Sequence, residues 1–113
     1  MPGSDRRAQL ERERARVLDQ IASLTMVFQG IVDSAELVAT DDEHDPEGHT
    51  IAYERQQVAA LIRDARTRLD ELEQALVRVD AGSYGVCTSC GAKIPAERLN
   101  ARPGAHTCVD CAW

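Results

Sequence analysis

The stretch GSYGVCTSCGAKIPAERLNARPGAHTCVDCA, residues 82–112, decides the fold of this chain, because it holds all four cysteines. They form two Cys-x-x-Cys pairs, Cys87 with Cys90 and Cys108 with Cys111. A tight turn inside each pair brings its two thiolates to one point, and Gly91 directly after the first pair permits such a turn. Two pairs complete the tetrahedron that structural zinc prefers. We therefore predict one structural Zn²⁺ ion bound by the four cysteines.

Other uses of the cysteines remain as alternatives. Two disulfides would need an oxidising compartment, and the sequence shows neither a charged-then-apolar leader nor a long apolar run. We expect no export signal, no membrane span and a cytoplasmic location, where thiols stay reduced. An iron–sulfur cluster or a redox Cys-x-x-Cys does not explain two matched pairs.

The composition favours long solvated helices over a broad core, since 28% of the residues are charged and only 4% are aromatic. The net charge of −6 argues against general affinity for a nucleic-acid backbone. The sequence shows no Ser-His-Asp order, no His-Glu-x-x-His and no phosphate-binding glycine loop. We therefore expect that the protein is not an enzyme.

Upstream of the cysteines, apolar residues recur at alternating steps of three and four along two stretches, 5–40 and 50–80. This pattern predicts two helices that pack along their length, the first ~54 Å long at ~1.5 Å per residue. Because a short segment with Pro46 joins them, an antiparallel hairpin is favoured over a parallel dimer of two copies. The predicted fold is all-α: a long antiparallel coiled-coil hairpin (1–80) followed by a small zinc finger (81–113). The seam residues are Leu10, Val17, Ile21, Leu24, Phe28, Ile31, Ala35 and Val38, then Ile51, Val58, Leu61, Ala65, Leu69, Leu72, Leu76 and Val79.

Single residues carry further expectations. Pro46 suits the first turn of the second helix, with Thr50 as an alternative start, and Gly82 is expected to cap the end of that helix. Leu99, in a short helix expected after Pro95, should pack toward the metal site or the base of the hairpin. His106 is expected to be a neighbour of the metal site rather than a ligand, because four suitably spaced cysteines are already present.

The bend of the hairpin, residues 41–49, holds five acids and no Lys or Arg. Acids that follow a helix oppose its dipole by ~0.3–1 kcal/mol each, so the cluster carries a local cost without visible compensation. We interpret it as a functional acidic tip rather than a solvated turn. Its members are Asp41, Asp42, Glu43, Asp45 and Glu47.

The finger resembles the zinc finger of the DksA/TraR family. The resemblance rests on Gly85-Val-Cys-x-x-Cys-Gly, Ile94, Arg98-Leu99-x-Ala101-Arg102-Pro103 and Cys108-Val-Asp-Cys111. It implies a transcription regulator that binds RNA polymerase without sequence-specific DNA contact. The hairpin would enter the secondary channel, set its tip carboxylates near the catalytic magnesium and modulate initiation. Arg98 and Arg102 are candidate contacts from the finger.

Two departures from the family pattern matter. Asp42 and Asp45 match the family tip, but Glu47 replaces a small residue, so a tip that stimulates transcript cleavage, as in Gre factors, is an alternative. Some members bind the alarmone ppGpp through basic residues, yet Glu71 and Ala112 stand where two of these are expected, which argues against alarmone binding. A zinc-knuckle nucleic-acid-binding protein and a structural coiled-coil adaptor are the alternatives from other classes.

Overall fold

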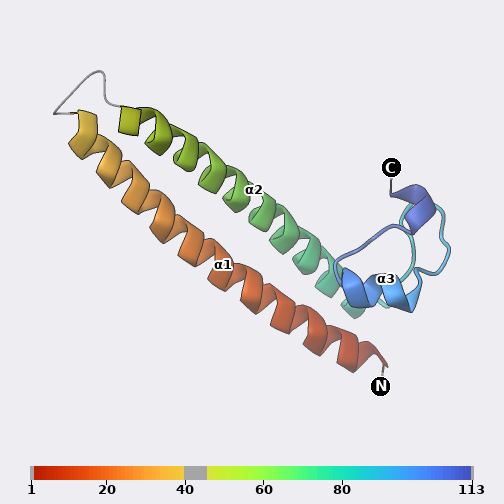
Figure 1. Cartoon of the computed structure of the whole chain (residues 1–113). Helices are drawn as coiled ribbons and strands as arrows, with labels where there is room; N and C mark the ends of the chain where they lie inside the picture. The colour runs from red at the N-terminus through yellow and green to blue at the C-terminus, as the bar shows by residue number, and fades with distance from the viewer. Residues whose placement is uncertain (1, 40–45, 113) are drawn as a thin grey trace. The chain divides into compact units, whose positions relative to one another are not determined.

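The computed structural model describes residues 2–39 and 46–112 (Figure 1). Helices form most of this part, and it contains no β-strand, which confirms the predicted all-α class. No helix within these residues combines the length and the apolar character that crossing a bilayer requires. The elements follow one another as α1 (Pro2–Ala39), α2 (Pro46–Ala81), α3 (Ala96–Ala101) and the 3-10 helix η1 (Val109–Cys111).

Helix α2 begins earlier than the alternative start at Thr50, because Pro46 is its first residue. Proline suits this position: its ring fixes a helical φ, and its missing N–H would have no partner there. Residues 46–49 of the predicted acidic tip therefore belong to the helix. Helix α1 ends at Ala39, close to the predicted boundary at 40.

The end of α2 is fixed by Gly82, as the sequence predicts. Gly82 adopts a φ of 78°, a left-handed conformation that glycine takes without steric cost. Its N–H donates to the Val79 carbonyl at 3.2 Å, and Ser83 N–H donates to the Arg78 carbonyl at 2.9 Å. These two bonds form a Schellman motif, which satisfies carbonyls left over at the helix end. The chain leaves the helix here and enters the finger.

The structure divides into two compact units, and residues 18–66 form one of them. In this unit the second part of α1 lies antiparallel beside the first part of α2 (Figure 1). One predicted seam position is wrong: Leu61 is 49% exposed, whereas its neighbour Ile62 is half-buried. At this point the residue that α2 turns inward lies one position further along the chain than the heptad pattern predicts. The predicted seam residues that are half-buried or buried here are Ile21, Leu24, Phe28, Ile31, Ile51, Val58 and Ala65.

Residues 1–17 and 67–113 form the other unit. Here the first part of α1 pairs with the last part of α2, and Leu10 is fully buried between them at 0% exposure. Ala75, which the heptad reading passed over, is also fully buried, because its small side chain lets two helices approach closely. Ion pairs flank this contact: Arg7 with Asp80, and Arg14 Nε with Glu73 Oε1 at 3.5 Å. Antiparallel pairing in both units confirms the predicted hairpin.

The loop after α3 packs directly on the α2 backbone through Gly104. A Cβ placed on Gly104 would lie 3.3 Å from Glu71 Cβ and 3.5 Å from Leu72 N. We therefore expect Gly104→Val to lower the free energy of unfolding by ~1–3 kcal/mol through overpacking. Urea denaturation followed by ellipticity measures the loss. As a control of opposite sign, Gly30→Ala adds a Cβ with no atom within 4 Å and should raise stability by ~0.5–1 kcal/mol. Equal stability of the Gly104→Val variant and the wild type would contradict the close contact.

Candidate functional site

The first cysteine pair sits on a tight turn that the backbone closes. Cys87 N–H donates to the Ala92 carbonyl at 2.8 Å, and Gly91 N–H donates to the Cys87 carbonyl at 3.0 Å. Gly91 has a φ of 77°, so the turn needs glycine at this position. An isolated antiparallel bridge between Val86 and Lys93 spans the base of the turn. The two sulfurs of this pair therefore project from one rigid loop.

The second pair flanks η1: Cys108 precedes this short helix and Cys111 is its last residue. Cys111 N–H donates to the Cys108 carbonyl at 3.1 Å, which holds this pair in a single turn. Thr88 joins the two pairs, since its N–H and its hydroxyl donate to the His106 carbonyl at 2.8 Å and 3.1 Å. The predicted role of His106 as a neighbour of the site, rather than a ligand, agrees with these contacts. Thr88 thus fixes the register of one turn against the other.

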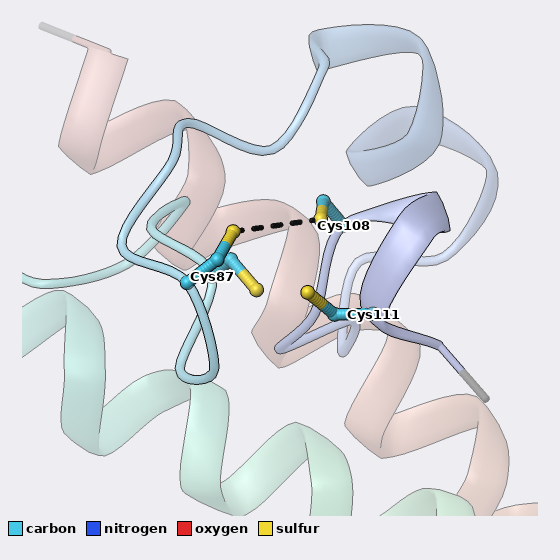
Figure 2. A group of neighbouring side chains, drawn as sticks. Cys87, Cys108 and Cys111 are labelled. Atoms are coloured by element: carbon cyan, nitrogen blue, oxygen red, sulfur yellow. Dashed lines mark hydrogen bonds between the residues drawn. The ribbon is translucent and has the colours of Figure 1, made fainter.

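The four sulfur atoms converge on one point. All lie within 4.8 Å of one another, and Figure 2 shows labelled members of the group turned toward a shared space. Cys90 Sγ lies 3.7 Å from Cys108 Sγ. Sulfurs placed ~2.3 Å from one ion in a tetrahedron stand ~3.8 Å apart, so this separation fits zinc. Within the described residues, these cysteines are the one group of His, Cys, Asp or Glu side chains that converges in this way.

The electrostatics of the site also favour a cation. Backbone N–H groups of Cys108 and Cys90 lower the pKa of Cys87 to about 6, so this thiol ionises readily. Side-chain hydrogen bonds with the sulfurs of Cys108, Cys90 and Cys87 raise the pKa of Cys111 to about 12, because they favour its protonated form. A divalent cation at the centre would replace that proton and hold all four thiolates.

A small apolar cluster supports the site from below. It consists of Cys87, Ile94, Leu99 and Ala105, with Tyr84 packed against it. The burial of Leu99 confirms the prediction that α3 turns this residue inward. Tyr84 Oη donates to the Pro103 carbonyl at 2.7 Å, and burial raises its pKa. The cluster is too small to hold the finger folded without metal, because it buries only one Leu and one Ile.

The two predicted finger arginines differ in their surroundings. Arg98 is half-buried, and its Nε donates to the Thr107 carbonyl at 2.9 Å, which ties α3 to the segment before Cys108. Arg102 is exposed, and its Nη2 lies 3.7 Å from Glu71 Oε2. Arg98 therefore has a structural contact, whereas Arg102 faces solvent with a carboxylate beside it.

Most of the predicted acidic tip lies outside the described residues. This holds for Asp41, Asp42, Glu43 and Asp45, whereas Glu47 belongs to the first turn of α2. One contact was not predicted from the sequence. It joins α1 to the finger, where Arg6 Nη1 donates to Asn100 Oδ1 at 2.8 Å. The only signal for it was the excess of arginine among residues 6–16.

Comparison with known proteins points to one family. The sequence profile described as the prokaryotic dksA/traR C4-type zinc finger matches residues 82–112. Protein YteA of Bacillus subtilis is 36% identical over 78 residues, covering 69% of this chain and 33% of YteA. The RNA polymerase-binding transcription factor DksA of Escherichia coli is 41% identical over 46 residues, covering 41% of this chain and 30% of DksA. The matches thus span about a third of the length of these relatives.

A solved structure matches over most of the chain. The transcription factor DksA2 of Pseudomonas aeruginosa has a TM-score of 0.52 and 26% sequence identity, covering 91% of this chain and 79% of DksA2. The similarity therefore extends beyond the finger to both long helices. Together with the four converging cysteines, it identifies the C-terminal module as a four-cysteine zinc finger that binds one zinc ion.

Proposed function

Because this chain belongs to the DksA/TraR family of zinc-finger proteins, we propose that it binds RNA polymerase and regulates transcription. The observation that carries the proposal is an antiparallel hairpin, with a zinc finger after its second helix and an acidic connection between its helices. A zinc finger and an acidic tip between two helices are the two features that the resemblance to the DksA/TraR family implies. The partner is thus a protein machine, and DNA is not contacted in a sequence-specific way.

We further propose that the hairpin enters the secondary channel of the polymerase and modulates initiation there. Two ordered helices lose little conformational entropy on insertion, which favours binding in a narrow channel. Asp41, Asp42, Glu43 and Asp45 lie between the end of α1 and the start of α2, at the turn of the hairpin. Carboxylates at that turn suit contact with magnesium or with basic residues of the polymerase.

The test separates binding from activity. We expect the full chain to bind core RNA polymerase and to change the output of initiation in a purified transcription assay. Replacing Asp42 and Asp45 together by Asn should leave the dissociation constant within about threefold, since the tip is a minor share of a standard interface, and should abolish the effect on initiation. Asp19→Asn, an exposed acid on α1, is the control. Failure of the wild type to bind polymerase would refute the proposal, and an unchanged effect of the double variant would remove the tip from the mechanism.

Stimulation of transcript cleavage is a second candidate, favoured by Glu47. This residue supplies a further carboxylate in the first turn of α2, where the family pattern has a small residue. A stalled, backtracked polymerase complex distinguishes the two activities. Cleavage that depends on Glu47 and is lost in Glu47→Ala would support this candidate, whereas no stimulation by the wild type would exclude it.

We also propose that ppGpp does not act through the finger of this protein. Arg102, which matches a basic position of alarmone-binding members, already lies beside the Glu71 carboxylate. A negative charge at that position repels the phosphates of the nucleotide. The effect on initiation should therefore be equal with and without ppGpp when the polymerase carries no alarmone site of its own.

A further inference from the structure

A polar hollow of ≈ 740 Å³ lies on the unit formed by residues 1–17 and 67–113, and we call it the α1–α3 groove. This unit carries ten of the thirteen Lys and Arg residues of the chain and nine of its nineteen Asp and Glu residues. The net charge of −6 therefore belongs to residues 18–66, and the groove lies on a unit that does not repel anions. Its lining residues are Asp5, Arg6, Gln9, Arg12 and Arg16 of α1 and Asn100 of α3.

Arg6 orients two amide side chains in this groove. Its Nη1 donates to Gln9 Oε1 at 2.9 Å and to Asn100 Oδ1 at 2.8 Å. Because a guanidinium donates and cannot accept, both amides must turn their oxygen toward it. The NH₂ groups of the two amides are then the parts that can donate to a ligand. Side chains that are already ordered lose less entropy when a ligand binds.

Arg12 adds a guanidinium beside Gln9. It follows Gln9 by three residues, ~4.5 Å along the helix axis, so the two side chains are neighbours on the helix surface. Arg12 is exposed and makes no hydrogen bond or ion pair with any residue in the described part of the chain. All of its N–H groups can therefore donate to a ligand.

The charges in the groove are unevenly placed. Arg16 Nε donates to Glu13 Oε2 at 3.1 Å, so these two residues form a neutral pair at one end. Asp5 is the acid among the lining residues, and it lies seven residues before Arg12, ~10 Å along the helix axis. The favourable place for an anion is therefore between Arg6 and Arg12, where the two amides also donate.

A second guanidinium raises the positive potential at Arg6. Arg78 Nη2 is buried and has no hydrogen-bond partner among the described residues. Burial raises the pKa of Tyr84, and the nearby charges of Arg6 and Arg78 lower it, so both cations act on the same hydroxyl. A buried donor without a partner is unfavourable. An anion bound at Arg6 would offset part of that cost through its opposite charge.

The arrangement of the donors favours a phosphate group over a carboxylate. Donors from α1 and from α3 approach the same space, and a carboxylate has only two oxygens in one plane to accept from them. A phosphate group presents three strong acceptor oxygens in different directions. Two linked phosphates add oxygens and charge along the helical turn from Gln9 to Arg12. Among the six lining residues none is aromatic, so the base of a nucleotide has no stacking partner in the groove.

We propose that the α1–α3 groove is a binding site for a diphosphate group, as in inorganic pyrophosphate. Arg6 and Arg12 supply the positive charge, and the NH₂ groups of Gln9 and Asn100 donate to the phosphate oxygens. The site is separate from Arg102 of the finger, which has the Glu71 carboxylate beside it. Binding here requires no polymerase, so its test is independent of the proposed function.

The experiment is a titration of the zinc-bound, ¹⁵N-labelled full-length protein with sodium pyrophosphate, followed by NMR. We expect saturable shifts of the side-chain NH₂ signals of Gln9 and Asn100 and of the Arg12 Nε–H signal. Arg12→Gln should weaken binding by about tenfold or more, because it removes a charge-assisted contact. Lys93→Gln makes the same change in charge at an exposed residue of the finger and, as the matched control, should bind as the wild type.

Two further variants change the site in opposite directions. Asn100→Asp keeps an oxygen for Arg6 but replaces the NH₂ donor by a negatively charged oxygen, so it should abolish binding. Asp5→Asn removes a repulsive charge and should strengthen binding by about twofold. Ellipticity, and zinc content measured after the titration, verify that each variant is still folded.

A parallel titration with ADP distinguishes free pyrophosphate from a nucleotide. Equal affinities would mean that the groove recognises the diphosphate alone, and tighter binding of ADP would make a nucleotide the source of the group. The absence of saturable shifts at the groove with either ligand would overturn the proposal. Equal weakening by Arg12→Gln and Lys93→Gln would also overturn it, because binding would then follow the net charge of the protein. Shifts confined to the finger around Arg98 and Arg102 would place the ligand elsewhere and contradict the assignment.

Discussion

Removing zinc is expected to unfold residues 82–112 while α1 and α2 stay helical. The finger buries only Cys87, Ile94, Leu99 and Ala105, and one member of this cluster is itself a predicted zinc ligand. Apparent zinc-binding free energies of ~10–16 kcal/mol are typical of such modules and exceed what so few apolar contacts supply. Cys87→Ser should have the same result as chelation, because Cys87 is both a ligand and, at 2% exposure, part of the core.

The two parts of the chain report separately in this experiment. Far-UV ellipticity should fall only slightly, since α1 and α2 contain 38 and 36 residues and α3 contains 6. Amide signals of the finger in a ¹⁵N–¹H NMR spectrum should lose their dispersion after chelation and recover when zinc is added back. Ser89→Ala, inside the first pair but not a ligand, is the control. Preserved dispersion of the finger signals after complete zinc removal would contradict the assignment of a metal-dependent fold.

Leu10→Ala is expected to have the second large effect, a loss of ~2–5 kcal/mol in the free energy of unfolding. Leu10 is the largest fully buried side chain among the described residues, at 0% exposure. Its removal leaves a cavity where the first part of α1 meets the last part of α2. Ala75 is also fully buried, and its single methyl group cannot move to fill that cavity.

Chemical denaturation of the zinc-bound protein measures this loss. Leu18→Ala is the matched control, since Leu18 lies on the same helix and is 42% exposed; it should cost less than about 1 kcal/mol. The denaturation midpoint should fall for Leu10→Ala and stay close to that of the wild type for Leu18→Ala. Equal shifts for the two variants would mean that Leu10 is not a core residue of the folded protein.

Features set by local spacing could be predicted from the sequence. The two Cys-x-x-Cys pairs converge as expected, Gly82 ends α2 with a left-handed residue, and Leu99 is buried beneath the site. Each of these depends on residues close together in the chain. The inward position of Ile62 was missed, because Leu61 fits an alternating heptad equally well and only the partner helix decides between them.

Contacts between distant segments could not be predicted. The pairing of Arg6 with Asn100 and the approach of Gly104 to Glu71 join residues with no common pattern in the sequence. The acidic tip remains a prediction from residues 41–47. The division of the chain into a hairpin of residues 1–80 and a finger of residues 81–113 is likewise still a prediction.

We expect the acidic residues between the two long helices to reach the active centre of RNA polymerase. A photo-crosslinking amino acid in place of His44, among these residues, tests this most directly in a complex with core polymerase. We predict crosslinks to polymerase segments that line the secondary channel near the catalytic magnesium, and none there from the same group placed at Lys93. Crosslinks from position 44 only to the outer surface of the polymerase or to DNA would contradict the account.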